Sequence, residues 1–293
     1  MSQRSAAQRR EQAQKLHGEI SDLISTMGCR EQWMAYLETA SRFTSYSYKN
    51  ILLILAQCPH AQRVAGYKKW LEHGRQVRKG EKAIRIFGYS TRTTTVTDKS
   101  TGEEQTRKVA YFPLVSVFDI SQTDTIEGQE SSARMPIDDI TSDGLAHVDE
   151  AIMDYMRQQD WSLTTTSDLP EGVYGVTHPQ RKEIRLSAEQ NGATFTSTLL
   201  HEVAHALLHS QDETMALPTA IKEVEAESVA YIVASALGLD SSAFSMPYIA
   251  RWSMKDPDLI EHTAKRVVHT AHQLLTVVDN HSNDEAVNAE QAA

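Results

Sequence analysis

The sequence lacks long apolar runs and contains very little cysteine. No stretch approaches the roughly eighteen consecutive apolar residues of a membrane-spanning helix, so we expect no transmembrane segment and no membrane partner. The two cysteines, Cys29 and Cys58, are too few for a disulfide framework or a thiolate zinc cluster. Residues 1–16 are polar and do not resemble a secretory signal. These absences predict a cytoplasmic protein.

Charge is distributed unevenly along the 293 residues. The net charge of −10 would argue against nucleic acid if it were spread evenly. Between residues 63 and 92, however, nine Lys or Arg stand against two Glu, whereas between residues 124 and 168 eleven acids stand against two Arg. This asymmetry predicts a basic binding module joined to an acidic domain.

The length and the pattern of apolar residues predict an α+β protein of two domains. Apolar residues become sparse between residues 122 and 141, where Gly, Ser, Asp and Glu dominate, as is typical of a linker. We therefore expect a DNA-binding domain at 1–123, an acidic linker at 124–141, a second domain at 142–280 and a disordered tail at 281–293. Within the second domain, residues 182–186 are predicted to form a strand that could pair with an extended peptide along its edge.

The most specific pattern is HEVAH at residues 201–205, inside a predicted helix at 193–209. His201 and His205 are four residues apart on one helical face, so both imidazoles can reach one zinc ion. Glu202 lies beside them, where its carboxylate can take a proton from a water molecule. The pattern is typical of a gluzincin-like zinc metallopeptidase, a hydrolase with the HExxH motif. The alternative is an amphipathic helix whose histidines are satisfied core residues.

A third ligand is expected from the next predicted helix, residues 219–237. Glu223 and Glu227 share the face that continues into an apolar stripe, whereas Glu225 points away from it. We therefore assign Glu223 as the third ligand, Glu227 as the partner of a histidine, and Glu225 as the alternative ligand. A solvated, Glu-rich first helical turn would explain the same residues.

His209 continues the four-residue spacing but is not expected to bind the same ion. Eight residues of helix advance about 12 Å, more than one zinc can span while it still holds His201. His209 is therefore expected to pack against the site or to support a ligand.

Cations and aromatic residues are interleaved between residues 46 and 82. Cations can neutralise phosphates, and aromatic rings can stack on unpaired bases, which favours single-stranded DNA as the partner. The alternative is a solvated basic face over buried aromatics, and Trp70 in particular could belong to a core. The candidate DNA-binding residues are Tyr46, Tyr48, Asn50, Lys68, Lys69, Trp70, Arg75, Arg78, Lys79 and Lys82.

The second half of the chain resembles zincin-like metallopeptidases of the ImmA/IrrE kind. The similarity lies in the strand KEIRL at 182–186, the helix with TLLHEVAH, and Glu223 followed by Ala226 and Ala230. In that family the Glu three residues before the first Ala is the third zinc ligand, which agrees with Glu223. Glu227 stands where that family has Asn.

The first half resembles the single-stranded-DNA-binding domain of ArdC-type antirestriction proteins. The shared motifs are YSYKNILLI at 46–54, GYKKWLEHGRQVRKGEKA at 66–83 and VFDISQT at 117–123. The resemblance implies a protein of a mobile element that protects incoming DNA from host restriction. Its protein substrate could be a restriction or repressor protein.

Three functions agree with these patterns. The protein could bind single-stranded DNA and act as a zinc metallopeptidase during antirestriction. It could coat DNA without catalysis and hold a structural metal. It could also be a regulatory protease that cleaves a repressor, with the DNA-binding domain used for targeting.

Overall fold

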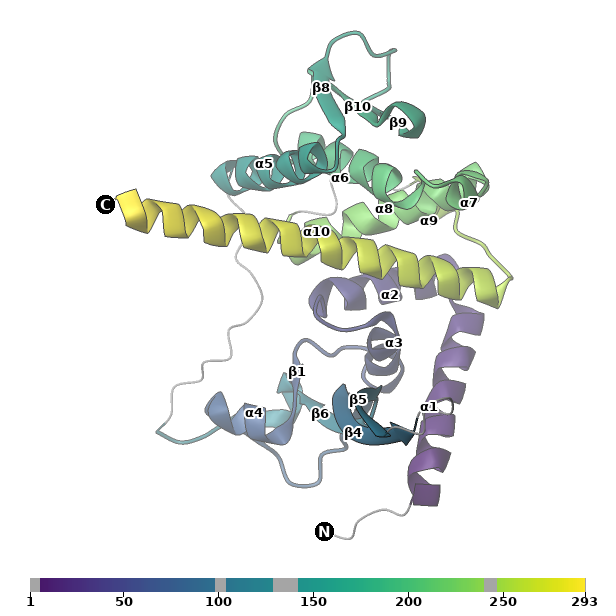
Figure 1. The fold of residues 1–293 in the computed structure, drawn as a ribbon, viewed down its shortest axis with the longest axis vertical. Coiled ribbons are helices and arrows are strands. Elements are labelled where there is room, and N and C mark those ends of the chain that lie inside the picture. Colours follow the sequence, from purple (N-terminus) through teal and green to yellow (C-terminus); the bar gives the residue numbers. More distant parts are fainter. Residues whose placement is uncertain (1–5, 98–103, 129–141, 240–246, 293) are drawn as a thin grey trace. The chain divides into compact units, whose positions relative to one another are not determined.

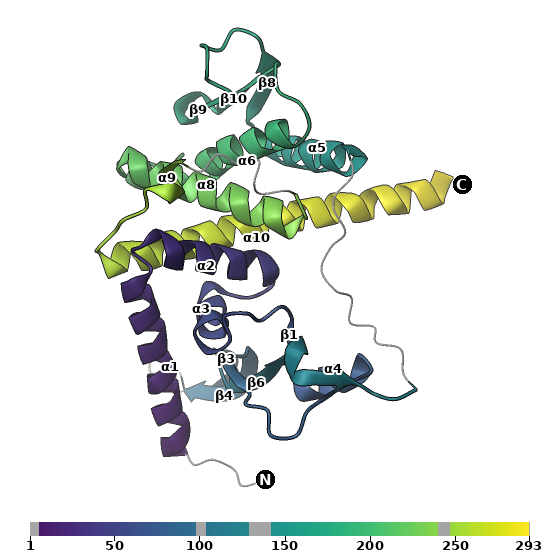
Figure 2. The same ribbon diagram turned by 180° about the vertical axis from the view of Figure 1, so that it is seen from behind.

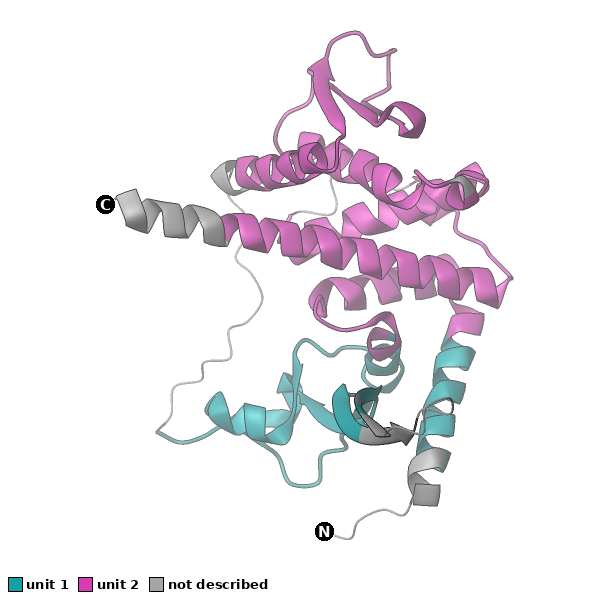
Figure 3. Ribbon diagram, viewed as in Figure 1, with its two compact units in different colours: residues 1–23, 52–134 teal, residues 24–51, 135–293 magenta. Residues whose placement is uncertain are grey.

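The computed structural model describes residues 6–97, 104–128, 142–239 and 247–292 and confirms an α+β protein (Figure 1). The chain divides into two compact units (Figure 3). Unit 1 comprises residues 1–23 and 52–134, and unit 2 comprises residues 24–51 and 135–293. Residues 24–51 thus belong with the C-terminal half, although the sequence predicts a single N-terminal domain at 1–123. Most of the expected linker at 124–141 lies outside the described residues.

Unit 1 is built from small antiparallel sheets. In the main sheet β6 lies between β1 and β3, β2 pairs with β7, and β4 pairs with β5 as a two-stranded hairpin. The elements are β1 (Val64–Ala65), α4 (Tyr67–Glu72), β2 (Arg75–Val77), β3 (Ile84–Phe87), β4 (Ser90–Thr97), β5 (Glu104–Tyr111), β6 (Leu114–Asp119), η1 (Ile120–Gln122) and β7 (Thr123–Thr125). Helices α1 (Ala6–Thr26) and α3 (Tyr48–Gln57) each contribute residues to both units.

The core of unit 1 forms around Trp70 of α4. Its indole is fully buried, and Nε1 donates a hydrogen bond of 2.8 Å to the Phe118 carbonyl oxygen of β6. Alternating residues of β3, Ile84 and Ile86, are buried with Val117 of β6, as expected for strands with one face on a core. This short helix is therefore fastened to the sheet by one aromatic side chain.

Asp119 organises the end of β6. Its carboxylate is fully buried and accepts hydrogen bonds from the backbone amides of Gln62, Arg63 and Ser121. Burial alone would raise the pKa of this carboxyl, but its donors hold the pKa below the usual range. The VFDISQT motif thus contains a buried anion that joins β6 to the segment before β1.

Unit 2 is a group of helices with a three-stranded sheet at one edge. In that sheet β10 is the central strand, parallel to β8 and antiparallel to β9. The elements are α2 (Arg30–Arg42), α5 (Ser142–Gln158), β8 (Ser162–Thr166), β9 (Gly175–His178), η2 (Pro179–Arg181), β10 (Glu183–Ser187), α6 (Gly192–Leu208), α7 (Asp212–Met215), α8 (Thr219–Ala236), α9 (Pro247–Ala250) and α10 (Pro257–Ala292). Because both edges of β10 are paired, residues 182–186 cannot take up a peptide by edge addition, contrary to the expectation from the sequence.

Helix α8 is the centre of unit 2 and packs against α6, α10 and α2 (Figures 1 and 2). The residues of α2 explain why this early segment lies here. Trp33 is fully buried, and its Nε1 donates to the hydroxyl of Ser228 on α8 at 3.0 Å. The Tyr36 hydroxyl is also buried and donates to the Ala264 carbonyl of α10 at 3.0 Å. The polar atoms of both aromatic side chains of α2 therefore find their hydrogen-bond partners in the C-terminal half.

The last helix is longer than the sequence suggests. Helix α10 continues to Ala292, so residues 281–292 are helical, whereas the sequence predicts a disordered tail. Glu and Ala are frequent in this segment, and their high helix propensity supports the extension. Among the described helices, none combines the length and apolarity needed to cross a membrane.

Candidate functional site

Helices α6 and α8 bring three metal-ligating side chains together. The Nε2 atoms of His201 and His205 are 3.1 Å apart, and Oε2 of Glu223 lies 3.4 Å from each of them. Donors at about 2.0–2.2 Å from one tetrahedral ion lie roughly 3.3–3.6 Å from each other, so this triangle fits a divalent metal. Two imidazole nitrogens and one carboxylate oxygen are also the donor set of many catalytic zinc sites.

The charges of the site agree with ion-binding chemistry. Burial alone would raise the pKa of Glu223, but the adjacent imidazoles of His201 and His205 hold it well below the usual range. The carboxylate is therefore ionised under all ordinary conditions. Ionised carboxylate is the form that a divalent cation requires from this side chain.

Glu202 is held by the neighbouring strand β9. Its side chain is 7% exposed, and the hydroxyl of Thr177 lies 2.7 Å from Oε2 and 2.9 Å from the Glu202 carbonyl oxygen. A Cβ atom on Gly175 would stand 2.6 Å from Cγ of Glu202, so only glycine permits this approach. The strand thus supplies both the space and the hydrogen bond that orient the carboxylate.

The other two glutamates of α8 have different partners. Glu225 is fully buried, and its Oε2 lies 2.9 Å from Nε2 of His209 while Oε1 accepts from Arg266. Glu227 accepts from the backbone amides of Tyr248 and Ile249 on α9, at 3.2 and 2.8 Å. Burial raises the pKa of Glu227 although both amides donate to it.

The sequence predicts that Glu227 supports a histidine, and the structure instead places it at main-chain donors 21 and 22 residues further along the chain. Backbone amides carry no sequence signature, which is why the pattern pointed to a side chain. Glu225 and Glu227 are therefore not part of the triangle and hold other hydrogen-bond partners.

A cavity of about 1200 Å³ opens over these residues. His201, Glu202 and Glu223 line it together with β9, the start of α6, and Tyr248 of α9. The edge of β9 is not paired by another described strand, and its residues Gly175–Thr177 border the cavity. A chain segment in the cavity could reach both the triangle and the backbone of β9.

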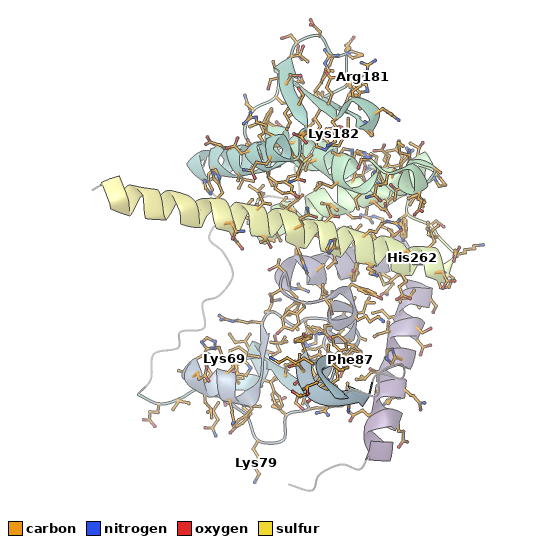
Figure 4. The ribbon with its side chains drawn as sticks, viewed as in Figure 1. Lys69, Lys79, Phe87, Arg181, Lys182 and His262 are labelled. Atoms are coloured by element: carbon orange, nitrogen blue, oxygen red, sulfur yellow. The ribbon has the colours of Figure 1, made fainter. Side chains whose placement is uncertain are left out.

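The cations predicted to bind DNA fall into two groups. Lys69 pairs with Glu72, Arg78 pairs with Glu81 and Asp124, and Arg75 donates to Thr123 and Thr125. The second group is exposed and has no ion-pair partner within the described ranges, and Figure 4 shows Lys79 pointing away from the ribbon. This second group consists of Lys68, Lys79 and Lys82.

Most of the predicted aromatic and amide residues already have contacts within the protein. Trp70 is a core residue, and Asn50 is 8% exposed. The Tyr48 hydroxyl donates to Glu261 of α10, and Tyr46 packs edge-to-face on Phe43. Tyr46, Tyr48 and Asn50 also belong to unit 2 and not to the basic unit 1.

The sequence analysis did not single out the exposed aromatics of the hairpin. Tyr89 and Phe112 are 71% and 65% exposed, with ring centroids 6.0 Å apart, and Tyr111 is 41% exposed. A signal was present, because the aromatics Tyr111 and Phe112 are adjacent at the end of β5, and successive side chains of an extended segment point to opposite sides. A two-stranded hairpin buries neither face by itself. Tyr67 on α4 is also exposed, at 46%.

Two protein-family models match separate parts of the chain. Residues 10–118 match the model of the N-terminal domain of anti-restriction factor ArdC, and residues 159–254 match the IrrE N-terminal-like domain. An uncharacterized protein of Bacillus anthracis is 24% identical over 296 residues, which is 89% of this chain and 50% of that protein. The chain thus spans half the length of this relative.

Two solved structures of the antirestriction ArdC protein from the R388 plasmid are also similar. The metal-free structure is 23% identical with a TM-score of 0.48, and the Mn(II)-bound structure is 20% identical with a TM-score of 0.46. Each alignment covers 80% of this chain and 86% of the solved chain.

Proposed function

Because this chain carries the N-terminal domain of the ArdC antirestriction family followed by an IrrE-like peptidase domain, we propose that it is an antirestriction protein with two activities. Unit 1 binds single-stranded DNA, and unit 2 hydrolyses peptide bonds with zinc as its metal. Such a protein acts in the cytoplasm, where incoming mobile DNA meets host restriction enzymes.

One observation carries the catalytic part. The triangle of His201, His205 and Glu223 adjoins Glu202, a buried carboxylate that Thr177 orients at 2.7 Å. A purely structural metal site needs no base, whereas peptide hydrolysis does. A protein substrate, such as a restriction or repressor protein, would lie in the cavity along the edge of β9.

The roles of the residues follow from this geometry. A divalent metal held by His201, His205 and Glu223 would supply Lewis acidity for the attacked carbonyl and for water. Thr177 fixes Oε2 of Glu202, which leaves Oε1 to take the proton of the attacking water and to pass it to the leaving amine. Gly175 keeps the space that this carboxylate occupies.

The DNA-binding part is supported by the exposed side chains of unit 1. Lys68, Lys79 and Lys82 are free to neutralise phosphates, and Tyr67 presents a ring beside Lys68. The exposed rings of Tyr89 and Phe112 add a second place where unpaired bases could stack. Buried Trp70 supports this surface from the core of unit 1.

Glu202→Gln tests the catalytic proposal. The amide has the size of the original carboxylate and both histidines are unchanged, so zinc and fold should be retained. The amide cannot take the proton of the attacking water. Cleavage of candidate restriction or repressor proteins should fall by a factor of about 10²–10⁴. Glu213→Gln, which changes an exposed glutamate of α7, should cleave like the parent. Equal cleavage by both variants would exclude Glu202 as the base.

A second function, protection of DNA by coating alone, is favoured by the unpaired lysines of unit 1. A transfer assay into a restricting host separates the two. If coating alone protects, Glu202→Gln should protect incoming DNA fully, whereas reversing Lys79 and Lys82 to Glu should reduce protection. If peptidase activity protects, Glu202→Gln should fail. A protease that cleaves a repressor would show cleavage of that repressor with no loss of transfer protection in either variant.

A further inference from the structure

A row of buried polar groups extends from the metal ligand His205 to α10. Nδ1 of His205 lies 3.0 Å from Nδ1 of His209, and Nε2 of His209 lies 2.9 Å from Oε2 of Glu225. The other oxygen of Glu225 accepts from Nε and Nη2 of Arg266. His209 is 3% exposed and Glu225 is fully buried, so water does not replace these contacts. Three helices, α6, α8 and α10, each supply part of the row.

The positions of the protons follow from what each group can donate. Arg266 only donates, and an ionised Glu225 only accepts, so Nε2 of His209 must carry the proton that bonds to Glu225. When His209 is neutral, the positive charge of Arg266 balances the negative charge of Glu225. A neutral His209 with a proton on Nε2 has an acceptor at Nδ1, and His205 must then donate from its own Nδ1.

This proton arrangement matters at the other side of the His205 ring. A neutral His205 with its proton on Nδ1 has a lone pair on Nε2, the atom 3.1 Å from Nε2 of His201 and 3.4 Å from Glu223. Reversal of the row would place the proton on Nε2 and block that donor. The direction of the His205–His209 and His209–Glu225 hydrogen bonds therefore decides whether Nε2 of His205 can bind a metal ion.

We infer that His209, Glu225 and Arg266 are positioning residues that hold His205 in the tautomer able to bind metal and so set the metal affinity. The inference rests on the proposed metal site but not on peptidase activity. Partners of a ligating histidine typically contribute a factor of about 10–100 to metal affinity. A merely structural row would join α6, α8 and α10 and would affect stability alone.

Glu225→Gln is the sharpest variant. With its carbonyl facing Arg266, the new amide group faces Nε2 of His209 as a donor, so the proton of His209 must move to Nδ1. The whole row then reverses and puts the proton of His205 on Nε2. Long-range proton–nitrogen NMR spectra of the metal-free full chain should assign the Nδ1–H tautomer to His205 in the parent and the Nε2–H tautomer in the variant.

Zinc affinity, measured by competition with a chelator, should fall about 10–100-fold in Glu225→Gln. His209→Phe, which fills the space but offers no acceptor, should give a similar loss if Glu225→Gln does not fold. Glu213→Gln is the matched control and should keep the parent affinity. Thermal unfolding of the metal-free proteins separates loss of ligand positioning from loss of stability.

The outcomes are distinct. An Nε2–H tautomer of His205 in the parent, or parent-like zinc affinity in both variants, overturns the inference. If the parent itself bound no zinc, the metal proposal would fail, and the tautomer assignment would still decide whether the row orients His205.

Discussion

The two charged clusters of this chain differ in where their counter-charges lie. In unit 2, Glu223 and Glu225 are anions whose partners lie on neighbouring helices at fixed distances. In unit 1, Lys79 and Lys82 are exposed and have no ion-pair partner within the described part of the chain. The first arrangement suits a small ion that must be held in one place. The second suits a flexible polyanion, because many weak interactions can form with no fixed geometry.

This contrast predicts how substitutions should act. Among the buried charged groups of unit 2, removal of one side chain leaves its neighbours buried without a partner, so the loss of affinity or stability should be large and local. Among the exposed lysines of unit 1, each cation should contribute a small, salt-dependent part of the DNA-binding free energy.

Removal of one imidazole should have the largest effect. His205→Ala or His201→Ala leaves two donors of three, so zinc affinity should fall by more than about the hundredfold expected for loss of a supporting group. Chelator competition and elemental analysis measure the loss. His262→Ala, which removes an exposed histidine of α10 (Figure 4), should hold zinc like the parent. Full occupancy in both site variants would refute the metal site.

Unit 1 also has a buried core, and Trp70→Ala tests how much Trp70 stabilises it. Loss of the buried ring and of its hydrogen bond to Phe118 should lower the free energy of unfolding by about 3–5 kcal/mol. Tyr67→Ala, on the exposed side of the same helix, should change it by less than about 0.5 kcal/mol. Urea denaturation of both variants measures the difference. Equal values would mean that Trp70 does not anchor the core.

Asp149 of α5 is a half-buried carboxyl with no ion-pair partner among the described residues, whereas the carboxylate of Glu225 is fully buried and paired with Arg266. Oδ1 of Asp149 has no hydrogen-bond partner among the described residues, and burial raises the pKa of Asp149 to about 6, against a hydrogen bond from Thr196. Because this folded-state pKa exceeds the unfolded value of about 3.9, its contribution to stability is greatest below about pH 4 and is lost as pH rises through 6.

Asp149→Asn should therefore stabilise the protein at pH 8 and leave it unchanged at pH 4. The expected gain is about 1–2 kcal/mol, because partial access to water weakens the effect of burial. Denaturation at both pH values measures it. Asp168→Asn, in an exposed loop, is the control and should show no pH-dependent gain. A gain of equal size at pH 4 would show that the carboxyl is not responsible.

The smallest effect per residue is expected on the DNA surface. Reversal of Lys79 and Lys82 to Glu should weaken single-stranded-DNA binding about tenfold at 0.1 M salt. The slope of log affinity against log salt should fall by about 1.4, or about 0.7 for each phosphate that is no longer neutralised. Reversal of Arg181 and Lys182, two exposed cations of unit 2, is the matched control (Figure 4). If both double variants weaken binding equally, net charge rather than this surface governs affinity.

The sequence predicted local geometry better than partners. The helix expected at 193–209 is α6, because the spacing of His201 and His205 and the surrounding apolar residues depend on one helical period. Glu223 of α8 lies beside these histidines, as expected, but the apolar stripe did not single it out, because α8 is buried on most sides and Glu225 is fully buried. The prediction of α6 needs only residues within a single element.

Interactions between distant segments could not be predicted in this way. The partner of Glu227 is the backbone of α9, and the burial of Trp70 depends on β6, almost fifty residues later. An aromatic in a short basic helix fits a stacking surface and a core equally well until its neighbours are known. The same reason explains why Tyr48 was expected to bind DNA, whereas its hydroxyl bonds to Glu261.

The membership of residues 24–51 in unit 2 has a consequence for biosynthesis. Trp33 and Tyr36 emerge from the ribosome early, but their partners Ser228 and Ala264 are made about 200 residues later. At about 5–20 residues per second, these aromatics wait roughly 10–40 seconds without their native neighbours. Unit 1 is complete long before then, so it can fold while the first segment of unit 2 is still unprotected. A nascent chain that stalls before α10 would therefore present a folded basic unit with an exposed, aggregation-prone helix beside it.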